Sequence, residues 1–340
     1  MSEQKLAGKV ALVAGGAKNL GGLISSTLAK QGAKIVVHYN SDSTKDAAAQ
    51  TVAAIKQAGG DAFAIQGNFT RVADVERVFA EAKTQFGGID IAVNTIGKVL
   101  KKPIVETTEA EYDSLMAINS KTAYFFLREA GKHLNDNGKV VTIVTSLLAA
   151  FTGLYSTYAG GKAPVEHFIR AAAKEFGARG ISVNSVGPGP MDTPFFYPAE
   201  TPDSIAYHKS ASINGKLTDI KDIAPIIEFL VTDGWWITGQ TIFATVATPH
   251  AKIAHDHRPG SRAPSDTTHR VSAAASLVRS RMRRRSFHAG SRIAPGFRQH
   301  HSRRRSRPAS VTQDPGKSQR RLDSYGRCQV QQSQPQAASW

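Results

Sequence analysis

Tyr158 and Lys162 are the residues whose types and spacing most directly suggest chemistry. They lie four positions apart in residues 158–162, Tyr-Ala-Gly-Gly-Lys, and on a helix this spacing places both side chains on one face. An ammonium beside a phenol stabilises the phenolate and lowers a pKa that is ~10 in the free side chain. Such a pair alone is also typical of a solvated helix face. Two further residues strengthen the case that the pair is catalytic: Ser146, at the end of an expected strand, and Asn119, at the start of an expected helix.

A glycine-rich turn follows the first expected strand. Residues 14–22 read Ala-Gly-Gly-Ala-Lys-Asn-Leu-Gly-Gly. Glycines there permit a tight turn and a close approach of backbone N–H groups to a pyrophosphate, and the next helix directs its positive end at the same anion. The alternative is a strand-to-helix connection that binds no ligand.

The hydrophobic pattern predicts a framework for both features. Apolar, β-branched runs alternate with helical patterns along residues 8–243, at the length that a strand-helix unit requires. The runs are apolar almost throughout, as strands covered on both faces are. Right-handed crossovers then predict a doubly wound parallel α/β sheet, in which ligands lie at the carboxyl ends of the strands. The expected strands are Val10–Ala14, Lys34–Tyr39, Ala62–Gln66, Ile89–Asn94, Lys139–Thr145, Ile181–Val186 and Thr241–Phe243.

The clearest expected helix follows Tyr39. Ser43 is its predicted cap, Asp46 lies in its first turn, and alanine, valine and isoleucine residues follow. Gly59 and Gly60 are predicted to end it.

The 340 residues, 36.5 kDa, divide into two parts by charge. Residues 245–340 hold 19 of the 43 Lys and Arg but 4 of the 27 Asp and Glu, so residues 1–244 are nearly neutral. The single Cys328 excludes an internal disulfide framework, no Cys/His spacing resembles a zinc site, and no apolar run is long enough to span a membrane. We expect a cytoplasmic protein with one catalytic domain in residues 1–244, no metal and no membrane contact.

Asn119, Ser146, Tyr158 and Lys162, in that order after the turn at residues 14–21, resemble the catalytic tetrad of the short-chain dehydrogenase/reductase family. The resemblance covers about residues 6–243. Further segments are similar to the family's segment after the fourth strand, its nicotinamide-side loop and the entry to its last strand: 94–97, Pro188-Gly189 with Thr193, and 237–240. The resemblance implies a Rossmann fold, a homodimer or homotetramer, and a small carbonyl substrate of the 3-oxoacyl or ketone class.

The resemblance also implies roles. Tyr158 is the general acid that protonates the substrate oxygen as hydride arrives from the nicotinamide, and the general base in reverse. Lys162 holds the ribose hydroxyls and lowers the pKa of Tyr158, Ser146 positions the carbonyl, and Asn119 holds a water that links Lys162 to solvent. The implied cofactor-binding residues are Gly15, Lys18, Asn19, Leu20, Gly21, Tyr39, Asn40, Ser41, Asn68, Phe69, Asn94, Ile96, Gly97, Tyr158, Lys162, Pro188, Gly189 and Thr193.

The glycine turn departs from the family's Thr-Gly-x-x-x-Gly-x-Gly pattern. Ala14 replaces the threonine and Asn19 the middle glycine. Asparagine tolerates a positive φ better than most residues, so we expect the turn to survive. Asn68-Phe69 stands where the family has an Asp-Val or Asp-Leu pair against adenine.

The catalytic segment departs from the pattern too. Gly161 replaces a common serine or alanine. Pro164 cannot donate to the carbonyl of Gly160, so we expect a local bend there. One residue is missing between Ser146 and Tyr158 compared with many relatives, which leaves Thr145 as the alternative hydroxyl.

Cofactor choice depends on the end of the second strand. An NAD-specific pocket places a carboxylate there to bond the ribose 2′-OH. Residues 38–41 read His-Tyr-Asn-Ser, Asp42 comes late, and Lys18 could reach a 2′-phosphate. We therefore favour NADP(H) over NAD(H), with reduction as the physiological direction. His38 itself is interpreted as a packed or surface residue.

The segment Pro190–Gly215 is predicted to form a mobile lid over the substrate. Its aromatic residues suggest an apolar or aromatic ketone, although packing of the lid or of a subunit interface explains them equally well. The lysines at 98, 101 and 102 could meet an anionic substrate, but a solvated run is the favoured interpretation. The expected lid residues are Phe195, Phe196, Tyr197 and Tyr207, and those of the opposite wall are Leu147, Leu148, Phe151, Leu154 and Tyr155.

The tail, residues 245–340, has 17 Arg, 2 Lys and no Glu. It cannot bury enough apolar surface to offset its ordering entropy, so we predict a low-complexity, disordered segment. Its arginine clusters at 281–285 and 303–307 could bind nucleic acid without sequence preference, which is the less favoured interpretation.

The genetic code offers an origin for the tail. Family members commonly end the last strand with Asn-Gly-Gly, and the codons GCC AAC GGT GGC TAC ACC ACA CGC encode Ala-Asn-Gly-Gly-Tyr-Thr-Thr-Arg. Deletion of one A from the second codon yields Ala-Thr-Val-Ala-Thr-Pro-His and then Ala, which is the sequence of residues 244–251. We therefore hypothesise that the residues after Ala244 are a frameshifted readout. Resequencing the gene and weighing the intact protein test this, and an in-frame tail in both contradicts it.

The leading interpretation is an NADPH-dependent carbonyl reductase. An NAD-dependent alcohol dehydrogenase is the alternative within the enzymes. A non-catalytic nucleotide-binding regulator is the alternative outside them, because the glycine turn is altered.

Overall fold

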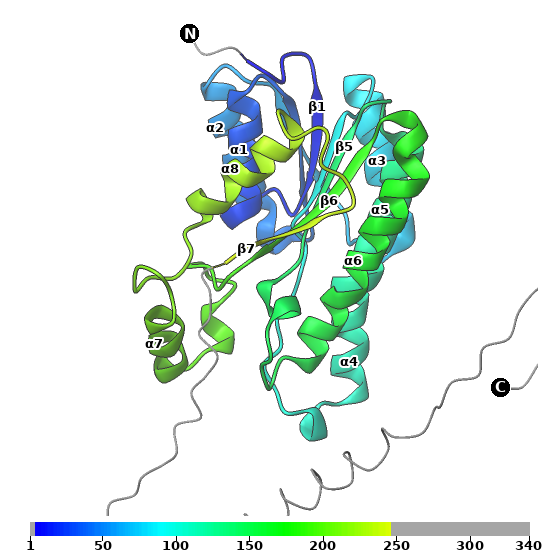
Figure 1. The fold of residues 1–340 in the computed structure, drawn as a ribbon. Helices are drawn as coiled ribbons and strands as arrows, with labels where there is room; N and C mark the ends of the chain where they lie inside the picture. The colour runs from blue at the N-terminus through cyan, green and yellow to red at the C-terminus, as the bar shows by residue number, and fades with distance from the viewer. Residues whose placement is uncertain (1–3, 246–340) are drawn as a thin grey trace, which may run out of the picture. The chain divides into compact units, whose positions relative to one another are not determined.

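The computed structural model describes residues 4–245. They form one seven-stranded parallel sheet in the order β3-β2-β1-β4-β5-β6-β7 (Figure 1). The order reverses between β1 and β4, where a doubly wound sheet opens a crevice at its carboxyl edge. The strands are β1 Val10–Ala14, β2 Lys34–Tyr39, β3 Ala62–Gln66, β4 Ile91–Asn94, β5 Lys139–Ile143, β6 Ser182–Pro188 and β7 Thr241–Ala244.

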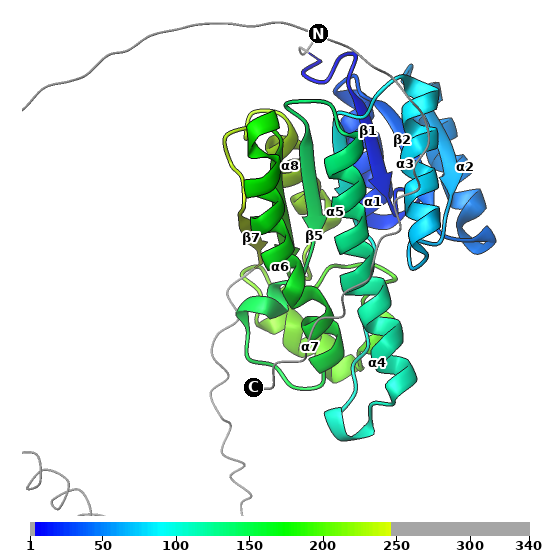
Figure 2. The same cartoon turned by 90° about the vertical axis from the view of Figure 1, so that its right-hand side faces the viewer.

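Helices cover both faces of the sheet. α1, α2 and α8 pack on one face and α3, α5 and α6 on the other, while α4 and α7 lie beyond the carboxyl ends of the strands (Figures 1 and 2). None of the described helices is long and apolar enough to cross a membrane. The helices are α1 Asn19–Lys30, α2 Lys45–Gln57, α3 Val72–Phe86, α4 Glu109–Met116, α5 Thr122–His133, α6 Ser156–Phe176, α7 Pro202–Ser210 and α8 Ile220–Val231.

Alternation of side chains along β1 divides the core into two layers. Leu12 points into the layer beneath α3, α5 and α6, whereas Ala11 and Val13 point into the layer beneath α1, α2 and α8. All three are fully buried. Truncation of such a buried leucine to alanine lowers the free energy of unfolding by about 2–5 kcal/mol. The two layers therefore form a stable base from which the loops at the carboxyl edge extend.

Sequence analysis predicted all seven strands, with shifts of one or two residues at four of them. β4 begins at Ile91, β6 covers Ser182–Pro188, β5 ends at Ile143 and β7 reaches Ala244. These ends are set by where pairing with a neighbouring strand starts, for example Ile91 with Ala11. The apolar run alone does not record that register.

The predicted cap of α2 is wrong. Ser43 lies inside a short 3₁₀ turn, Asp42–Thr44, and its hydroxyl meets that of Ser41 at 3.0 Å. Thr44 occupies the cap position, and its hydroxyl donates to the Ser41 carbonyl oxygen instead of accepting from the helix. The local hydrogen bonds of this serine-rich turn compete with capping.

Pro164 lies inside α6, which continues without interruption from Ser156 to Phe176. The predictions for residues 246–340, namely disorder, nucleic-acid binding and the frameshift, concern residues outside the described part of the chain.

Candidate active site

A cavity opens at the carboxyl edge of the sheet, on the side of the β1/β4 switch. Its wall combines the glycine turn after β1, the segment after β4, the segment after β5, the start of α6 and the lid. Tyr158 and Lys162 line the same cavity as Gly15, Lys18 and Asn19. The two features that the sequence singled out therefore share one site.

The glycine turn needs its glycines for space. Gly15 has φ +75°, and a Cβ at Gly21 would lie 2.1 Å from the Gly15 carbonyl oxygen. Asn19 has φ +51°, which confirms that asparagine accepts the left-handed conformation here. The Thr95 hydroxyl donates to the Ala14 carbonyl oxygen at 2.9 Å, so a hydroxyl reaches this turn from β4 although Ala14 has none.

The first turn of α1 is open to an anion. Its cap residue, Lys18, makes no side-chain cap hydrogen bond, and the turn contains no acidic residue. The free N–H groups and the positive end of the helix dipole therefore face the cavity together with the Lys18 ammonium. Helix N-termini of this kind commonly bind phosphate groups.

Tyr158 and Lys162 are almost fully buried on α6. The Lys162 ammonium donates at 2.9 Å to two carbonyl oxygens, those of Ile96 after β4 and Ile143 at the end of β5. Burial lowers the pKa of Lys162 to about 8. Lys162 is therefore held across the ends of two central strands, next to the cavity.

The expected lowering of the pKa of Tyr158 is not found in the chain itself. Burial raises the pKa of Tyr158 to about 12, and a hydrogen bond with the Thr145 side chain opposes that rise only in part. Burial lowers the pKa of Lys162 to about 8, so Lys162 loses its charge before a phenol with a pKa of about 12 ionises, and it does not stabilise the phenolate. Tyr158 is a neutral phenol, which is the state a proton donor requires.

Two hydroxyls compete for the position beside Tyr158. Thr145 is buried two residues after β5, hydrogen-bonds with the Tyr158 side chain and accepts from the Leu147 N–H at 3.3 Å. Ser146, the predicted residue, begins the 3₁₀ turn Ser146–Ala149 and lines the same cavity. Thr145, the alternative hydroxyl, is thus the one that contacts the phenol.

Asn119 lies in a π-helical segment, Ala117–Lys121, between α4 and α5. Its side chain forms a closed pair with the Lys98 backbone, accepting from the N–H at 3.0 Å and donating to the carbonyl at 2.9 Å. A Cβ on Gly161 would lie 3.1 Å from the Asn119 Cβ, so the glycine allows α6 to pack closely on this segment. A wider π turn at this point aims Asn119 at the loop after β4.

Most of the predicted cofactor residues line the cavity. Those outside its lining are Ser41, Asn68, Phe69 and Asn94. Phe69 is a core residue stacked on His38, and the Asn94 carboxamide accepts from the Ile96 N–H at 3.0 Å, which shapes the segment that Lys162 holds. Thr193 contributes a buried hydroxyl with no partner among the described residues, as a site for a polar ligand would.

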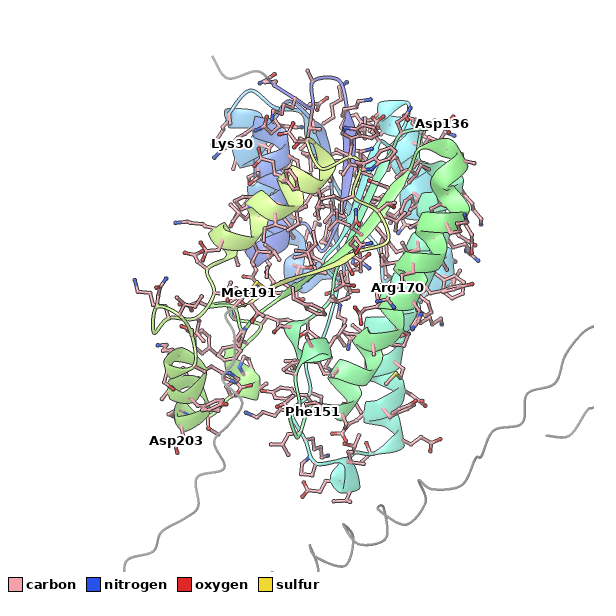
Figure 3. The ribbon with its side chains drawn as sticks, viewed as in Figure 1. Lys30, Asp136, Phe151, Arg170, Met191 and Asp203 are labelled. Atoms are coloured by element: carbon pink, nitrogen blue, oxygen red, sulfur yellow. The ribbon has the colours of Figure 1, made fainter. Side chains whose placement is uncertain are left out.

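The predicted substrate walls are only partly correct. Leu147, Tyr155, Phe195 and Phe196 line the cavity, and the Phe195 ring lies 6.5 Å from the Tyr158 ring. Phe151 is fully exposed at the outer rim (Figure 3). The other predicted wall and lid residues lie outside the lining: Leu148 packs on the core, and Leu154, Tyr197 and Tyr207 are exposed.

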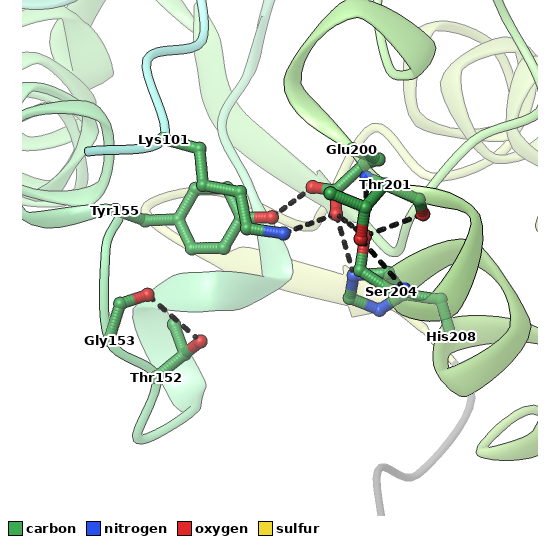
Figure 4. Close-up of polar contacts among 8 residues, drawn as sticks. All are labelled: Lys101, Thr152, Gly153, Tyr155, Glu200, Thr201, Ser204 and His208. Carbon is green, nitrogen blue, oxygen red and sulfur yellow. Dashed lines mark hydrogen bonds and ion pairs between the residues drawn. The ribbon is translucent and has the colours of Figure 1, made fainter.

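The lid is fastened by a carboxylate that sequence analysis missed. Glu200, whose side chain is 2 % exposed, accepts from the Lys101 ammonium, the Tyr155 hydroxyl and, at 2.6 Å, the Ser204 hydroxyl (Figure 4). His208 on α7 lies 3.7 Å away. Burial acts to raise the pKa of Glu200, but the hydrogen bonds from Lys101, Ser204 and Tyr155 outweigh it and lower that pKa.

These contacts also correct the prediction that the lysines at 101 and 102 belong to a solvated run. Lys101 pairs with Glu200 and Lys102 with Glu111, so neither is a free, solvated cation. No single pattern in the sequence links Glu200 to residues about a hundred positions away, because the contact forms only when the lid folds over the loop after β4.

Comparison with known proteins decides the family. Residues 15–245 match the family model described as enoyl-(acyl carrier protein) reductase. A hydroxynaphthalene reductase-like protein of Metarhizium brunneum is 35 % identical over 263 residues, which cover 71 % of this chain and 95 % of that protein. The chain belongs to the short-chain dehydrogenase/reductase family.

Solved members of the short-chain dehydrogenase/reductase family share the architecture. A Burkholderia cenocepacia structure named as a dehydrogenase with bound NADP is 59 % identical, with a TM-score of 0.71 over 73 % of this chain and 96 % of that one. The angucycline C-6 ketoreductase LanV with bound NADP is 30 % identical, with a TM-score of 0.67 over 72 % and 96 %. The expected fold is thus confirmed for residues 4–245.

Proposed function

We propose that this short-chain dehydrogenase/reductase is a carbonyl reductase that transfers hydride from NADPH to a ketone or aldehyde, with Tyr158 as the proton donor. The observation that carries the proposal is the juxtaposition of a buried, neutral phenol with the glycine turn in one cavity. Lys162 lies beside both, across the ends of β4 and β5.

The residues present fit a dinucleotide. The close approach of Gly21 to Gly15 and the uncapped start of α1 suit a pyrophosphate, and the unpartnered Thr193 hydroxyl suits a carboxamide. When bound, the nicotinamide supplies the hydride that reduces the carbonyl carbon. Lys162 would hold the ribose side of the cofactor, together with Ile96 and Gly97. The Ile96 carbonyl oxygen accepts from the Lys162 ammonium, and Gly97 lies beside that ammonium.

The chain supplies the proton and the geometry. The carbonyl oxygen gains a proton from the Tyr158 hydroxyl as the carbonyl carbon gains hydride, so the ketone becomes an alcohol and the phenol a phenolate. Because burial raises the pKa of Tyr158 to about 12, the proton-donating form needed for reduction is present at physiological pH. Thr145 or Ser146 orients the carbonyl by a hydroxyl hydrogen bond. Asn119, which is fixed by the Lys98 backbone, would hold a water that links Lys162 to solvent.

The charge of the cavity supports NADP(H) over NAD(H). Near the end of β2 the lining consists of Tyr39, Asn40 and Thr44, with Lys18 opposite, and Glu200 at the lid is the one carboxylate in the whole described lining. A 2′-phosphate would therefore meet a cation and no acid. The NADP bound in two related structures supports the same choice.

For the substrate we propose an apolar or aromatic ketone of the polyketide-like or quinone-like type. The cavity between α6 and the lid is lined by Leu147, Tyr155, Met191, Phe195 and Phe196. Relatives named hydroxynaphthalene reductase-like protein and angucycline C-6 ketoreductase support a fused aromatic ring system. A 3-oxoacyl compound is the second candidate.

The chain is further proposed to form a homodimer or homotetramer. Exposed aromatic residues on the outer surface, Tyr124 on α5, Phe229 on α8 and the pair Trp235 and Trp236 after it, support such contacts.

A ketone panel tests the proposal. Purified full-length chain is mixed with NADPH or NADH and with aromatic, quinone and 3-oxoacyl ketones, and absorbance at the nicotinamide band is followed. We expect NADPH to be oxidised with an aromatic ketone, at a kcat/KM at least roughly tenfold above that with NADH. Oxidation with NADH alone would favour the alcohol dehydrogenase, and no turnover despite nucleotide binding would favour a regulator.

A further inference from the structure

His38 is a fully buried histidine that the proposed reaction does not use. It is the fifth residue of β2 and points into the same layer of the core as Val36, two residues before it. Its ring stacks on Phe69 with 3.9 Å between the ring centroids. A buried polar side chain in an apolar layer needs partners for its polar atoms, and both ring nitrogens of His38 have one.

The two nitrogens of His38 reach two different turns. The Gly15 N–H donates to Nδ1 at 3.1 Å, and Nε2 lies 2.8 Å from the Gly67 carbonyl oxygen. Since Nδ1 accepts, Nε2 must carry the proton and donate, so the tautomer is fixed by the contacts. The His38 carbonyl oxygen also accepts from the Gly16 N–H at 3.0 Å.

The two turns differ in their relation to the cavity. Gly15 begins the glycine turn, which lines the cavity, whereas Gly67 begins the connection 67–69 after β3, whose residues Asn68 and Phe69 lie outside the lining. Gly67 in turn donates its N–H to the Tyr39 carbonyl oxygen at 3.0 Å, and Tyr39 lines the cavity where a 2′-phosphate would lie. One imidazole therefore bridges the segments after β1 and β3 from the strand between them.

We propose that His38 is a positioning residue for the dinucleotide, which holds the glycine turn and the 67–69 connection in their binding geometry before the cofactor arrives. The inference rests on the proposed function. A neutral imidazole suits this task because it offers an acceptor and a donor on opposite edges of one short, rigid ring. Preformed turns remove an ordering cost from binding, so loss of the bridge lowers cofactor affinity more than it lowers turnover.

Four variants test this role by separating its parts. His38→Ala removes both hydrogen bonds, His38→Asn keeps an acceptor near the Nδ1 position, and His38→Gln keeps a donor near the Nε2 position. Val36→Ala is the control. Val36 is equally buried in the same layer, and its side chain has no polar atom that could bond to either turn. The readouts are Kd for NADPH by nicotinamide fluorescence, kcat at saturating NADPH, the midpoint of thermal unfolding, and hydrogen exchange of the Gly15 amide.

For His38→Ala we expect Kd for NADPH to rise roughly tenfold, with kcat at saturation within about threefold of the native value, because hydrogen bonds to fixed turns are lost but the reacting groups are not. Exchange of the Gly15 amide accelerates. His38→Asn recovers most of the affinity, and His38→Gln recovers less. Val36→Ala lowers the unfolding midpoint without weakening NADPH binding.

The inference is overturned if His38→Ala binds NADPH as tightly as the native chain, or if Val36→Ala weakens binding as much as His38→Ala does. It is also overturned if Asn and Gln restore nothing. Native protein that binds no nucleotide would defeat the proposed function instead. In that case the exchange rate of the Gly15 amide in His38→Ala, measured without any cofactor, still decides whether His38 holds the turn.

Discussion

The two halves of the cavity are held together by different forces. The cofactor half, around the carboxyl ends of β1 to β4, is fixed by hydrogen bonds between buried or half-buried side chains and the backbone, as in the contacts of His38 with Gly15, of Thr95 with Ala14 and of Lys162 with Ile96. The substrate half is fixed by charged side chains that join separate segments, with Glu200 of the lid bound to Lys101 and Tyr155. The first half is thus set by the sheet, and the second is set by side-chain contacts between the lid and the segments that follow β4 and β5.

This difference matches the tasks of the two halves. A dinucleotide has one shape, so a preformed site costs little and gains affinity. A substrate must enter and leave, and a lid held by ion pairs and hydrogen bonds can open without disturbing the core. Tyr158 lies where the halves meet, on α6 and opposite Phe195 of the lid.

Adding one methyl group in the cofactor half should have the largest effect. Gly21→Ala would place a Cβ 2.1 Å from the Gly15 carbonyl oxygen, so the turn must move away from the phosphate position. We expect NADPH affinity to fall by roughly 10³-fold, about 4 kcal/mol, measured by fluorescence titration. Gly22→Ala is the matched control, since its Cβ meets nothing closer than 3.4 Å. Equal losses in both variants would show that the turn is not specifically shaped.

Acid should weaken the cofactor half through His38. Burial lowers the pKa of His38 from 6.5 to about 4, opposed by the hydrogen bond to Gly67, with Arg77 lowering it and Asp74 raising it slightly. Because the unfolded state takes up the proton first, the contribution of His38 is present above pH 6.5 and is lost as the pH falls to about 4. We expect the free energy of unfolding to fall by about 2 kcal/mol from pH 7 to pH 5 on this account.

Urea unfolding of the native chain and of His38→Asn at both pH values measures this effect. The variant lacks the titrating ring, so its unfolding free energy should fall by less over the same interval. Parallel losses in the two proteins would mean that His38 is not the group responsible.

At the junction of the halves, the choice between two hydroxyls can be decided. Thr145 contacts Tyr158, so Thr145→Ala should lower kcat by roughly 10²-fold, and Thr145→Ser should restore most of it. Ser146→Ala should lower kcat by less than about tenfold. The reverse order would assign the carbonyl-binding role to Ser146, as sequence analysis first predicted.

In the substrate half, loss of the lid carboxylate should have a smaller effect. Glu200→Gln keeps the size but leaves the Lys101 ammonium without a counter-charge, so we expect KM for the ketone to rise about tenfold while Kd for NADPH is unchanged. Glu111→Gln is the control, because the Lys102–Glu111 pair lies outside the cavity lining and its cap of α4 tolerates glutamine. A change in NADPH affinity with Glu200→Gln would contradict the separation of the two halves.

What the sequence predicts follows the same division. The strands, the glycine turn and the pair Tyr158 and Lys162 are encoded by short patterns, because main-chain geometry and helix spacing dictate them. The Glu200–Lys101–Tyr155 contacts are not encoded locally, and no spacing rule relates residues that meet only through tertiary folding.

Two misjudged residues show the physical limit. Phe151 is aromatic but fully exposed, in the loop that follows the 3₁₀ turn and outside the cavity lining (Figure 3). The pKa of Tyr158 was expected to fall, yet burial raises it, since desolvation depends on packing that composition does not reveal. His38 was interpreted as a packed or surface residue; it is buried, and its two hydrogen bonds were not foreseeable from the sequence.

The most direct measurement compares Tyr158→Phe with the native chain for kcat with an aromatic ketone and for Kd of NADPH in the same preparation. Removal of the hydroxyl alone takes away the proton donor, so kcat should fall by roughly 10³-fold while Kd stays within about threefold. A variant that turns over at the native rate would contradict the account, because the proton would then come from another group.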